Sequence, residues 1–339
     1  MGNEHTEYSG EIDVPVEAIR IVDPSVLAKL PQGTIITSVA AHGASFWTRT
    51  AKLDAFLNDR PKEYFLKTSH GDRGKGMMSG EFTSMSLMYE ANPDLVPKPI
   101  AWGTYTTIPD VHFFLCNFHN MTDDLPDLHS FPAMLAKLHR NGSSPNGSFG
   151  FPVKTYHGQT PIDHGWSDTW EEYFKRTTTV LLRLEQESQG LNKELLDMAD
   201  PFLNKVIPRL LRPLETGGRS IKPCLIHGDL WYGNATMDGD SELPIIFDAA
   251  CFYAHNEYDL GVWRATWNKI GKPYITRYHK HFPISPPEED HDDRNALYAT
   301  RVGILDSILY KGNSGYREKL IIEMKKLVEK FPGGYEGAS

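Results

Sequence analysis

The feature that most constrains this chain is a loop motif followed by a short apolar strand. Residues 227–234 read HGDLWYGN, and the apolar run LPIIF at 243–247 leads directly into Asp248. If the apolar stretch before the motif and LPIIF are joined through a turn at Asp238, they form a hairpin-like unit. Such a unit would bring together, at one end, the oxygen-bearing side chains of Asp229, Asn234 and Asp248.

This spacing suits phosphoryl transfer from ATP. Asp229 is placed to orient an acceptor hydroxyl and take its proton, whereas Asn234 and Asp248 offer hard oxygen ligands for Mg²⁺. Each residue alone has an ordinary explanation, since an aspartate beside glycine forms turns and asparagine caps them. The combination of His-x-Asp, an asparagine five residues on and an aspartate after a strand is what favours a kinase-type site.

A kinase site also requires a strand lysine and a helix carboxylate upstream. Lys67 lies in a strand predicted at 63–69. Glu81 is predicted to open the next helix, after a glycine-rich loop at 70–80, and to pair with that lysine. The ordinary alternatives are a lysine facing solvent from an edge strand and a carboxylate at a helix N-terminus.

Two further segments are candidates for binding the nucleotide. A turn of small residues at 40–45 would cover the phosphates through Gly43, Ala44 and Ser45, and an ordinary hairpin turn explains it equally well. The strand HFFLCNF at 112–118 runs into a segment expected to link two lobes. Main-chain groups there would bind adenine, and the candidates are Asn117, Phe118 and His119.

The order of predicted elements indicates an α+β protein with two lobes. β-rich segments and one helix come first, and amphipathic helices dominate later, around one island of strand and loop at 222–253. We expect an N-terminal extension at 1–33, a small β-rich N-lobe at 34–118 and a larger, mainly helical C-lobe at 119–339.

Local signals set the expected helix bounds. A short N-terminal helix, or two fragments, is broken at Pro24, and a later helix is capped by Asp168 with Glu171 three residues on. The remaining helices are expected at 130–141, at 192–211 with a break at Pro201, at 294–311 and at 316–331.

These residues resemble the fructosamine kinases, also called ketosamine-3-kinases or protein-ribulosamine 3-kinases. The resemblance covers about residues 35–310 and rests on HGDLWYGN, IIFDAACFYAHNEYDLG, FLK and HGWSDTWEEYF. It implies a two-lobed, protein-kinase-like fold of the aminoglycoside-phosphotransferase branch, with ATP and Mg²⁺ as cofactors. It assigns the general base to Asp229, and the acceptor site to Trp231, His255 and Glu257.

The implied reaction is phosphorylation of the 3-hydroxyl of a ribulosamine or fructosamine on a protein lysine, after which the unstable adduct sheds the sugar. Substrates would be glycated proteins or small ketosamines. The alternatives are a small-molecule kinase acting on an aminoglycoside or choline-like alcohol, and a nucleotide-binding pseudokinase scaffold. The chain departs from the family pattern at three places: the turn at 40–45 lacks a glycine run and cysteine, Ala249 replaces proline, and Asn117 replaces an acidic residue.

Composition limits the expected binding partners and the expected cellular compartment. A net charge of -9 argues against binding to nucleic acid or anionic membranes. Three cysteines without paired spacing suit a reducing compartment, here the cytoplasm. We expect neither a signal peptide nor a membrane span, although MGNEHT matches a loose myristoylation pattern at Gly2. The 312–339 tail would either pack on the C-lobe or serve a partner, and the oligomeric state is left open.

Overall fold

The computed structural model describes residues 13–43 and 45–336, which separate into two compact units. The first unit consists of Met1–Thr83 and Pro97–His119, and the second of Ser84–Val96 and Asn120–Ser339. The first is built around a β-sheet and the second mainly from helices, which confirms the predicted α+β class.

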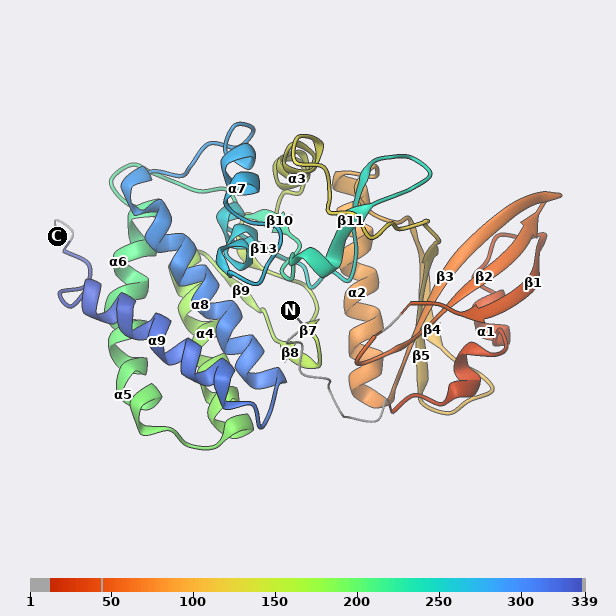
Figure 1. Cartoon of the computed structure of the whole chain (residues 1–339), viewed down its shortest axis with the longest axis horizontal. Helices are drawn as coiled ribbons and strands as arrows, with labels where there is room; N and C mark the ends of the chain where they lie inside the picture. The colour runs from red at the N-terminus through yellow and green to blue at the C-terminus, as the bar shows by residue number, and fades with distance from the viewer. Residues whose placement is uncertain (1–12, 44, 337–339) are drawn as a thin grey trace. The chain divides into compact units, whose positions relative to one another are not determined.

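The first unit contains one antiparallel sheet of five strands, ordered β1-β2-β3-β5-β4 (Figure 1). The bounds are β1 Thr34–Ala41, β2 Arg49–Leu57, β3 Arg60–His70, β4 Pro99–Thr104 and β5 Val111–Asn117. The central strands β3 and β5 bury Leu66, Phe113 and Leu115 completely. The sequence of β5 is nearly continuous in apolar residues, whereas β3 has a shorter apolar stretch, Tyr64–Leu66; both stretches indicated a strand.

Two short helices precede the sheet, and Pro24 separates them as predicted. They are η1 Val16–Ile19 and α1 Pro24–Leu27. The buried Asp23 caps α1 by accepting from the Ser25 N–H. Its carboxylate also accepts from the backbone N–H and hydroxyl groups of Thr106 and Thr107. This one side chain therefore attaches the N-terminal segment to the connection between β4 and β5.

Helix α2 corrects one prediction. It spans Gly71–Ala91, so the glycine-rich stretch expected to be a loop is its first half, and Glu81 lies in its middle. Each glycine disfavours an isolated helix by about 1 kcal/mol relative to alanine. Tertiary packing selects the helix here, because a Cβ on Gly74 would lie 2.7 Å from the backbone of Ser69 in β3. The close approach of helix and strand buries Met78 completely.

The second unit is organised around the long helix α8, which packs against α4 and α9 (Figure 1). The α-helices are α3 Ser130–Asn141, α4 Trp170–Gln189, α5 Lys193–Pro201, α6 Ile207–Leu211, α7 Lys272–Tyr278, α8 His291–Leu309 and α9 Ser314–Lys330. The predicted cap of α4 is wrong by one residue, because Thr169 accepts from the Glu172 N–H in place of Asp168. Across the described ranges, every helix is either too short or too polar to span a bilayer.

The break predicted at Pro201 takes the form of a π-helical segment, Phe202–Val206, which joins α5 to α6. Proline lacks an N–H and its ring crowds the preceding turn, so the regular α-helical ladder cannot pass through it. A local widening of the helix keeps the chain helical across this point.

Short strands are more numerous in the second unit than the single island predicted at 222–253. They are β6 Phe149–Gly150, β7 Thr155–His157, β8 Thr160–Ile162, β9 Trp166–Ser167, β10 Cys224–Ile226, β11 Ala235–Met237, β12 Pro244–Ile246 and β13 Phe252–Ala254. Strands of two or three residues show no alternation that a sequence pattern could reveal. The hairpin in the motif is β11–β12, whereas the apolar stretch before the motif, β10, pairs with β13.

Candidate active site

Buried groups of the second unit hold the HGDLWYGN loop in place. Asp259, in the 3₁₀ turn η5 (Asn256–Leu260), accepts hydrogen bonds from the backbone N–H groups of His227 and Gly228 at 2.8 and 2.9 Å. His139 of α3 lies 3.1 Å from the same carboxylate. Burial opposes ionisation of Asp259, but the bonds from His139 and Gly228 hold its pKa below the ordinary value. A buried, ionised carboxylate therefore fixes the start of the loop.

Two more side chains fix the rest of the loop. The indole N–H of Trp263 donates to the Leu230 carbonyl at 2.8 Å, and Asn268 accepts from the Tyr232 N–H at 3.1 Å. Sequence analysis missed these two residues, as it missed Asp259 and His139. For Asp259 the sequence offered one signal, a charged residue inside the run EYDLGVW. The sequence does not show which backbone groups such a residue will reach after folding.

The loop requires glycine at position 228. Its φ is +82°, and a Cβ there would lie 2.3 Å from the Ala250 carbonyl oxygen. The neighbouring His227 ties the same two segments together, because its Nε2 donates to the Phe247 carbonyl and its Nδ1 accepts from the Asp229 N–H. The loop thus contacts the segment after β12 on both sides of Asp248, at Phe247 and at Ala250.

Asn234 and Asp248 lie at the open end of the β11–β12 hairpin. The Phe247 N–H donates to the Asn234 carbonyl at 3.2 Å, which places the two predicted ligands in adjoining segments. The amide nitrogen of Asn234 donates to the Asp229 carbonyl at 2.8 Å, so its amide oxygen is the atom left to coordinate a cation. Asp248 has a φ of 58°, a strained conformation that is concentrated at functional sites.

An amide oxygen and a carboxylate fit Mg²⁺, which prefers hard oxygen ligands and completes its shell with water and phosphate oxygens. A cluster of three or more His, Cys, Asp or Glu side chains suited to a metal is absent from residues 13–43 and 45–336. Two such ligands would leave the rest of the coordination shell of a Mg²⁺ ion to water and to phosphate oxygens.

Asp229 itself follows the loop's sharp turn and stays partly accessible, with 19% of its side chain exposed. One carboxylate oxygen lies 3.4 Å from Nδ1 of His157, at the end of β7. Sequence analysis did not single out this histidine. A partly accessible carboxylate with an imidazole on one side suits the role predicted for Asp229.

Trp231 belongs to a small aromatic group next to Asp229 in the chain. Its ring meets Trp267 edge-on at 6.1 Å and Tyr232 at 5.1 Å. The indole lies over Gly233, where a Cβ would come within 2.3 Å of the ring. Trp267 is 44% exposed, so the group is open to solvent on one side. Aromatic faces of this kind can pack against a sugar ring, and Trp231 stays our predicted acceptor contact.

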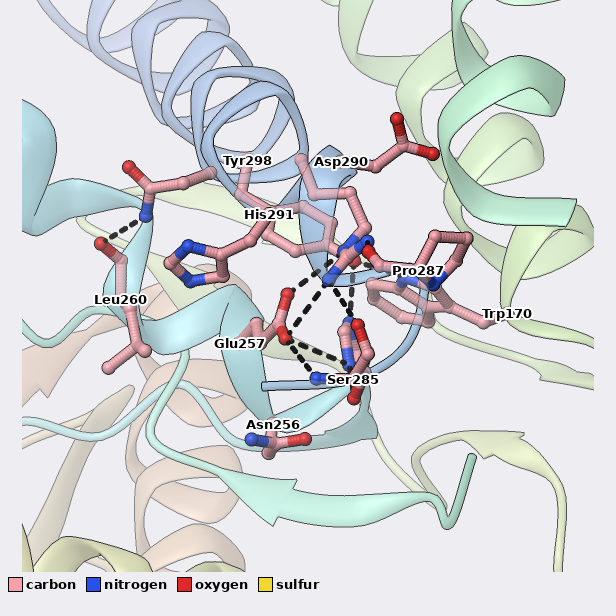
Figure 2. A network of polar contacts seen from close by, with 12 residues as sticks. Trp170, Asn256, Glu257, Leu260, Ser285, Pro287, Asp290, His291 and Tyr298 are labelled. Carbon is pink, nitrogen blue, oxygen red and sulfur yellow. Dashed lines mark hydrogen bonds and ion pairs between the residues drawn. The ribbon is translucent and has the colours of Figure 1, made fainter. Parts of the chain in front are cut away.

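The predicted roles of His255 and Glu257 require a correction. Both side chains are almost completely buried, at 0% and 1% exposure. Glu257 forms a two-point ion pair with Arg294 and accepts from the Ser285 N–H (Figure 2). His255 is hydrogen-bonded to the hydroxyls of Tyr298 and Ser285, each at 2.8 Å, and burial lowers its pKa to about 4.

Because their polar atoms are already used inside the protein, His255 and Glu257 are not available to a sugar in this structure. Glu257 lies within η5, the turn that carries Asp259, and His255 immediately precedes it, so their contacts support this turn. The sequence suggested substrate contact because these residues are part of a distinctive run, FYAHNEY.

The first unit contains the predicted Lys67–Glu81 ion pair. The ammonium of Lys67 in β3 lies 2.8 Å from the carboxylate of Glu81 in α2, and both side chains are at most 10% exposed. A pair this sheltered excludes the solvent-facing alternative for the lysine. It holds the ammonium in a fixed position, as the binding of nucleotide phosphates requires.

The other nucleotide-binding candidates are placed less decisively. Ala44 lies outside the described residues. Gly43 has a φ of +78°, and Ser45 stabilises the turn by accepting from the N–H groups of Trp47 and Thr48. These are the features of an ordinary turn, the alternative that the sequence left open.

At the end of β5, the N–H groups of Asn117 and Phe118 donate to the carbonyls of Lys98 and Glu63. These two residues could therefore offer adenine only their carbonyl oxygens. The ring of Phe118 is contacted by His42 and Lys52.

Sequence comparison gives a consistent family match. A model of the fructosamine kinase family matches residues 45–328. A chloroplastic protein-ribulosamine 3-kinase of Oryza sativa subsp. indica is 31% identical over 236 residues, 69% of this chain and 65% of that protein. The chain thus spans slightly less than two thirds of that relative's length. The ketosamine-3-kinase of Mus musculus is 28% identical over 270 residues, 74% of this chain and 84% of that protein.

Structure comparison agrees with the predicted fold. A Thermobifida fusca YX-ER1 protein provisionally named fructosamine-3-kinase has a TM-score of 0.67 at 20% identity, covering 88% of this chain and 95% of its own. The aminoglycoside phosphotransferase APH(4)-Ia has a TM-score of 0.56 at 13% identity, covering 90% and 95%. At these identities the likeness concerns the fold alone, and it confirms the two-lobed, protein-kinase-like class.

Proposed function

The chain belongs to the fructosamine kinase family, and from this premise we propose that it transfers the γ-phosphoryl group of ATP to the 3-hydroxyl of a ketosamine. The acceptor would be a ribulosamine or fructosamine on a glycated protein lysine, or a free ketosamine. The observation that carries the proposal is the conformation of the HGDLWYGN loop. In this conformation Asp229 is partly exposed, and the amide nitrogen of Asn234 donates to the Asp229 carbonyl. Asp248, after the next strand, has a strained positive φ.

In the proposed reaction, Asp229 takes the proton of the 3-hydroxyl as that oxygen bonds to the γ-phosphorus. The bond between the γ-phosphorus and the bridging oxygen breaks, and ADP leaves. A Mg²⁺ ion held by Asn234 and Asp248 would neutralise charge on the β- and γ-phosphates. Positioning and charge stabilisation supply most of the rate, so Asp229 has no need of strong basicity.

Several binding roles belong to the same proposal. Lys67, held by Glu81, would bind phosphate oxygens, and the turn with Gly43, Ala44 and Ser45 would lie over them. The end of β5 would bind adenine through Asn117, Phe118 and His119. The lobe division at 34–118 and 119–339 is likewise kept as a proposal, with Trp231 as the acceptor contact.

The product would be a ketosamine 3-phosphate, which is unstable and sheds the sugar. The freed amine makes the net result a deglycation. Cys116, Cys224 and Cys251 are all buried thiols, which supports a reducing compartment, and we propose the cytoplasm.

The test is incubation of the protein with ATP, Mg²⁺ and ribulosyl- or fructosyl-lysine, with ADP release and the ³¹P NMR spectrum of the product as readouts. We expect ADP in step with a 3-phosphate. ADP release only with aminoglycosides or choline-like alcohols would replace the substrate class. Absence of ADP with every acceptor would indicate a pseudokinase and overturn the proposal.

A further inference from the structure

One imidazole next to Asp229 has a buried nitrogen that lacks a hydrogen-bond partner. His157 is 6% exposed, and its Nδ1 makes no hydrogen bond within the described part of the chain. The nearest charged atom recorded for it is the Asp229 carboxylate oxygen, 3.4 Å away. A buried polar atom left without a partner costs about 1–3 kcal/mol. Such a cost in a native site calls for an explanation.

Rigid neighbours hold His157 in this position. It ends strand β7, which pairs with β8 in a tight hairpin. The hydroxyl of Thr155 in the same strand is bonded to Nε2 of His164 at 2.7 Å. The other nitrogen of His164 is bonded to the Tyr173 hydroxyl of helix α4 at 2.6 Å. The hairpin is thus fastened to a long helix, which fixes the backbone position from which the imidazole reaches Asp229.

A second carboxyl shares the neighbourhood. Asp306 is in α8, which also packs against β8. Burial is the main reason that the pKa of Asp306 is raised to about 6; the charge of Asp229 raises it further, and His157 opposes the change. His157 is therefore electrostatically coupled to two acidic groups, one of them the proposed base.

We propose that His157 is a positioning residue for Asp229. Its Nδ1–H donates to one carboxylate oxygen and fixes the carboxylate plane, so that the other oxygen faces the acceptor hydroxyl. The present 3.4 Å separation shortens when an acceptor occupies the site, as catalytic hydrogen bonds often do. The inference rests on the proposed function, because it takes Asp229 to be the base of the reaction.

The test compares two variants of similar size. His157→Asn keeps an N–H donor close to the position of Nδ1, whereas His157→Leu removes it. We expect kcat of the leucine variant to fall about 10²-fold, because a reacting group is misplaced. The KM for ATP and the KM for the ketosamine should change little. The asparagine variant should recover most of that loss at equal thermal stability. An unchanged kcat in the leucine variant, or no recovery with asparagine, would overturn the proposal.

A double variant and a spectroscopic readout separate this inference from the proposed function. In the Asp229→Asn background, His157→Leu should cause no further loss, since the group it positions is gone. Independently of turnover, Asp229→Asn should shift the ¹⁵N resonance of His157 Nδ1 more than that of Nε2. If the wild-type protein phosphorylates no ketosamine, the proposed function fails while this resonance still decides the contact. An unmoved Nδ1 resonance would overturn the contact even in an active kinase.

Discussion

The network around Glu257 and the loop around Asp229 lie in the same unit of the protein, but their polar groups differ in burial and in hydrogen bonding. Around Glu257, an arginine and a carboxylate are completely buried, and every nitrogen of Arg294 donates, to Glu257 or to the carbonyls of Ser285 and Pro287 (Figure 2). Around Asp229, the proposed base is partly exposed and Asp248 has a positive φ.

This difference separates structural from functional residues better than a motif does. A fully satisfied buried network has no capacity left for a ligand, because each donor and acceptor is already used. Unsatisfied or strained groups persist only where the surrounding structure holds them in place, and they concentrate at functional sites. By this criterion we expect FYAHNEY to support the loop and HGDLWYGN to carry the chemistry. The four predictions that follow test the division, in order of decreasing effect.

The largest expected effect is at the base. Asp229→Asn should lower kcat by about 10³-fold, since proton transfer by a positioned group contributes on the order of 10²–10⁴. Nucleotide affinity should be almost unchanged, because the substitution keeps the shape of the side chain. Turnover and the nucleotide dissociation constant would be measured on the same preparation. Lost nucleotide binding with retained turnover would contradict the assigned role.

Removing one member of the buried pair should act on stability. Arg294→Met leaves the Glu257 carboxylate buried without its partner and should cost about 3–5 kcal/mol in the free energy of unfolding. The control is the double variant with Glu257→Leu, which leaves no unpaired charge and should cost less. Urea unfolding measures both. A stable Glu257→Leu single variant with a raised acceptor KM would restore the substrate-binding role and erase the contrast.

Two glycines with similar backbone conformations differ in their surroundings. Gly147 has a φ of +75° with open space around it, and Gly228 has a φ of +82° with the Ala250 oxygen where a Cβ would be. Gly147→Ala should therefore cost only the conformational penalty, about 1–2 kcal/mol. Gly228→Ala should cost more and should also reduce turnover, because the loop has to shift. Equal losses of stability with full activity in both variants would show that the loop geometry is not critical.

The smallest expected effect concerns how the contributions of two carboxyls, Glu257 and Asp306, to stability depend on pH. Burial opposes ionisation of Glu257, but Arg294 holds its pKa below 4.5, so its stabilisation is present above that pH and is lost as the pH falls. The pKa of Asp306 is raised from 3.8 to about 6, so stability falls as the pH rises through that range.

Asp306→Asn should therefore stabilise the protein near pH 8 by about 1–2 kcal/mol and have little effect near pH 3.5. Glu257→Gln should instead destabilise it near pH 8 and flatten the acid limb of the stability curve. Thermal unfolding across this pH range measures both slopes. Parallel curves for the two variants would show that the two carboxyls have similar environments.

Much of the site could be predicted because its signals are local. Asp229, Asn234 and Asp248 lie within one short stretch, and β5 shows a nearly unbroken apolar sequence. The Lys67–Glu81 pair followed from a strand and a helix that are adjacent in the chain, and the structure contains it. The same local signals carried the resemblance that the family match confirmed.

The rest depended on contacts between segments that are distant in the sequence. The glycine-rich half of α2 is helical because β3 lies close against it, which outweighs the weak propensity of glycine. Asp259, His139 and His157 reach the loop only through folding, and His255 and Glu257 are buried only because α8 and the segment around Ser285 cover them.

The sequence by itself determined the family, the two-lobed class and the residues of the central motif, because these depend on residue type and short spacing. Only the tertiary structure decided which polar residues of that region are buried supports and which stay accessible for chemistry. Burial and hydrogen-bond satisfaction are properties of a residue's surroundings, and in Glu257 and Asp229 the same kind of carboxylate has opposite surroundings.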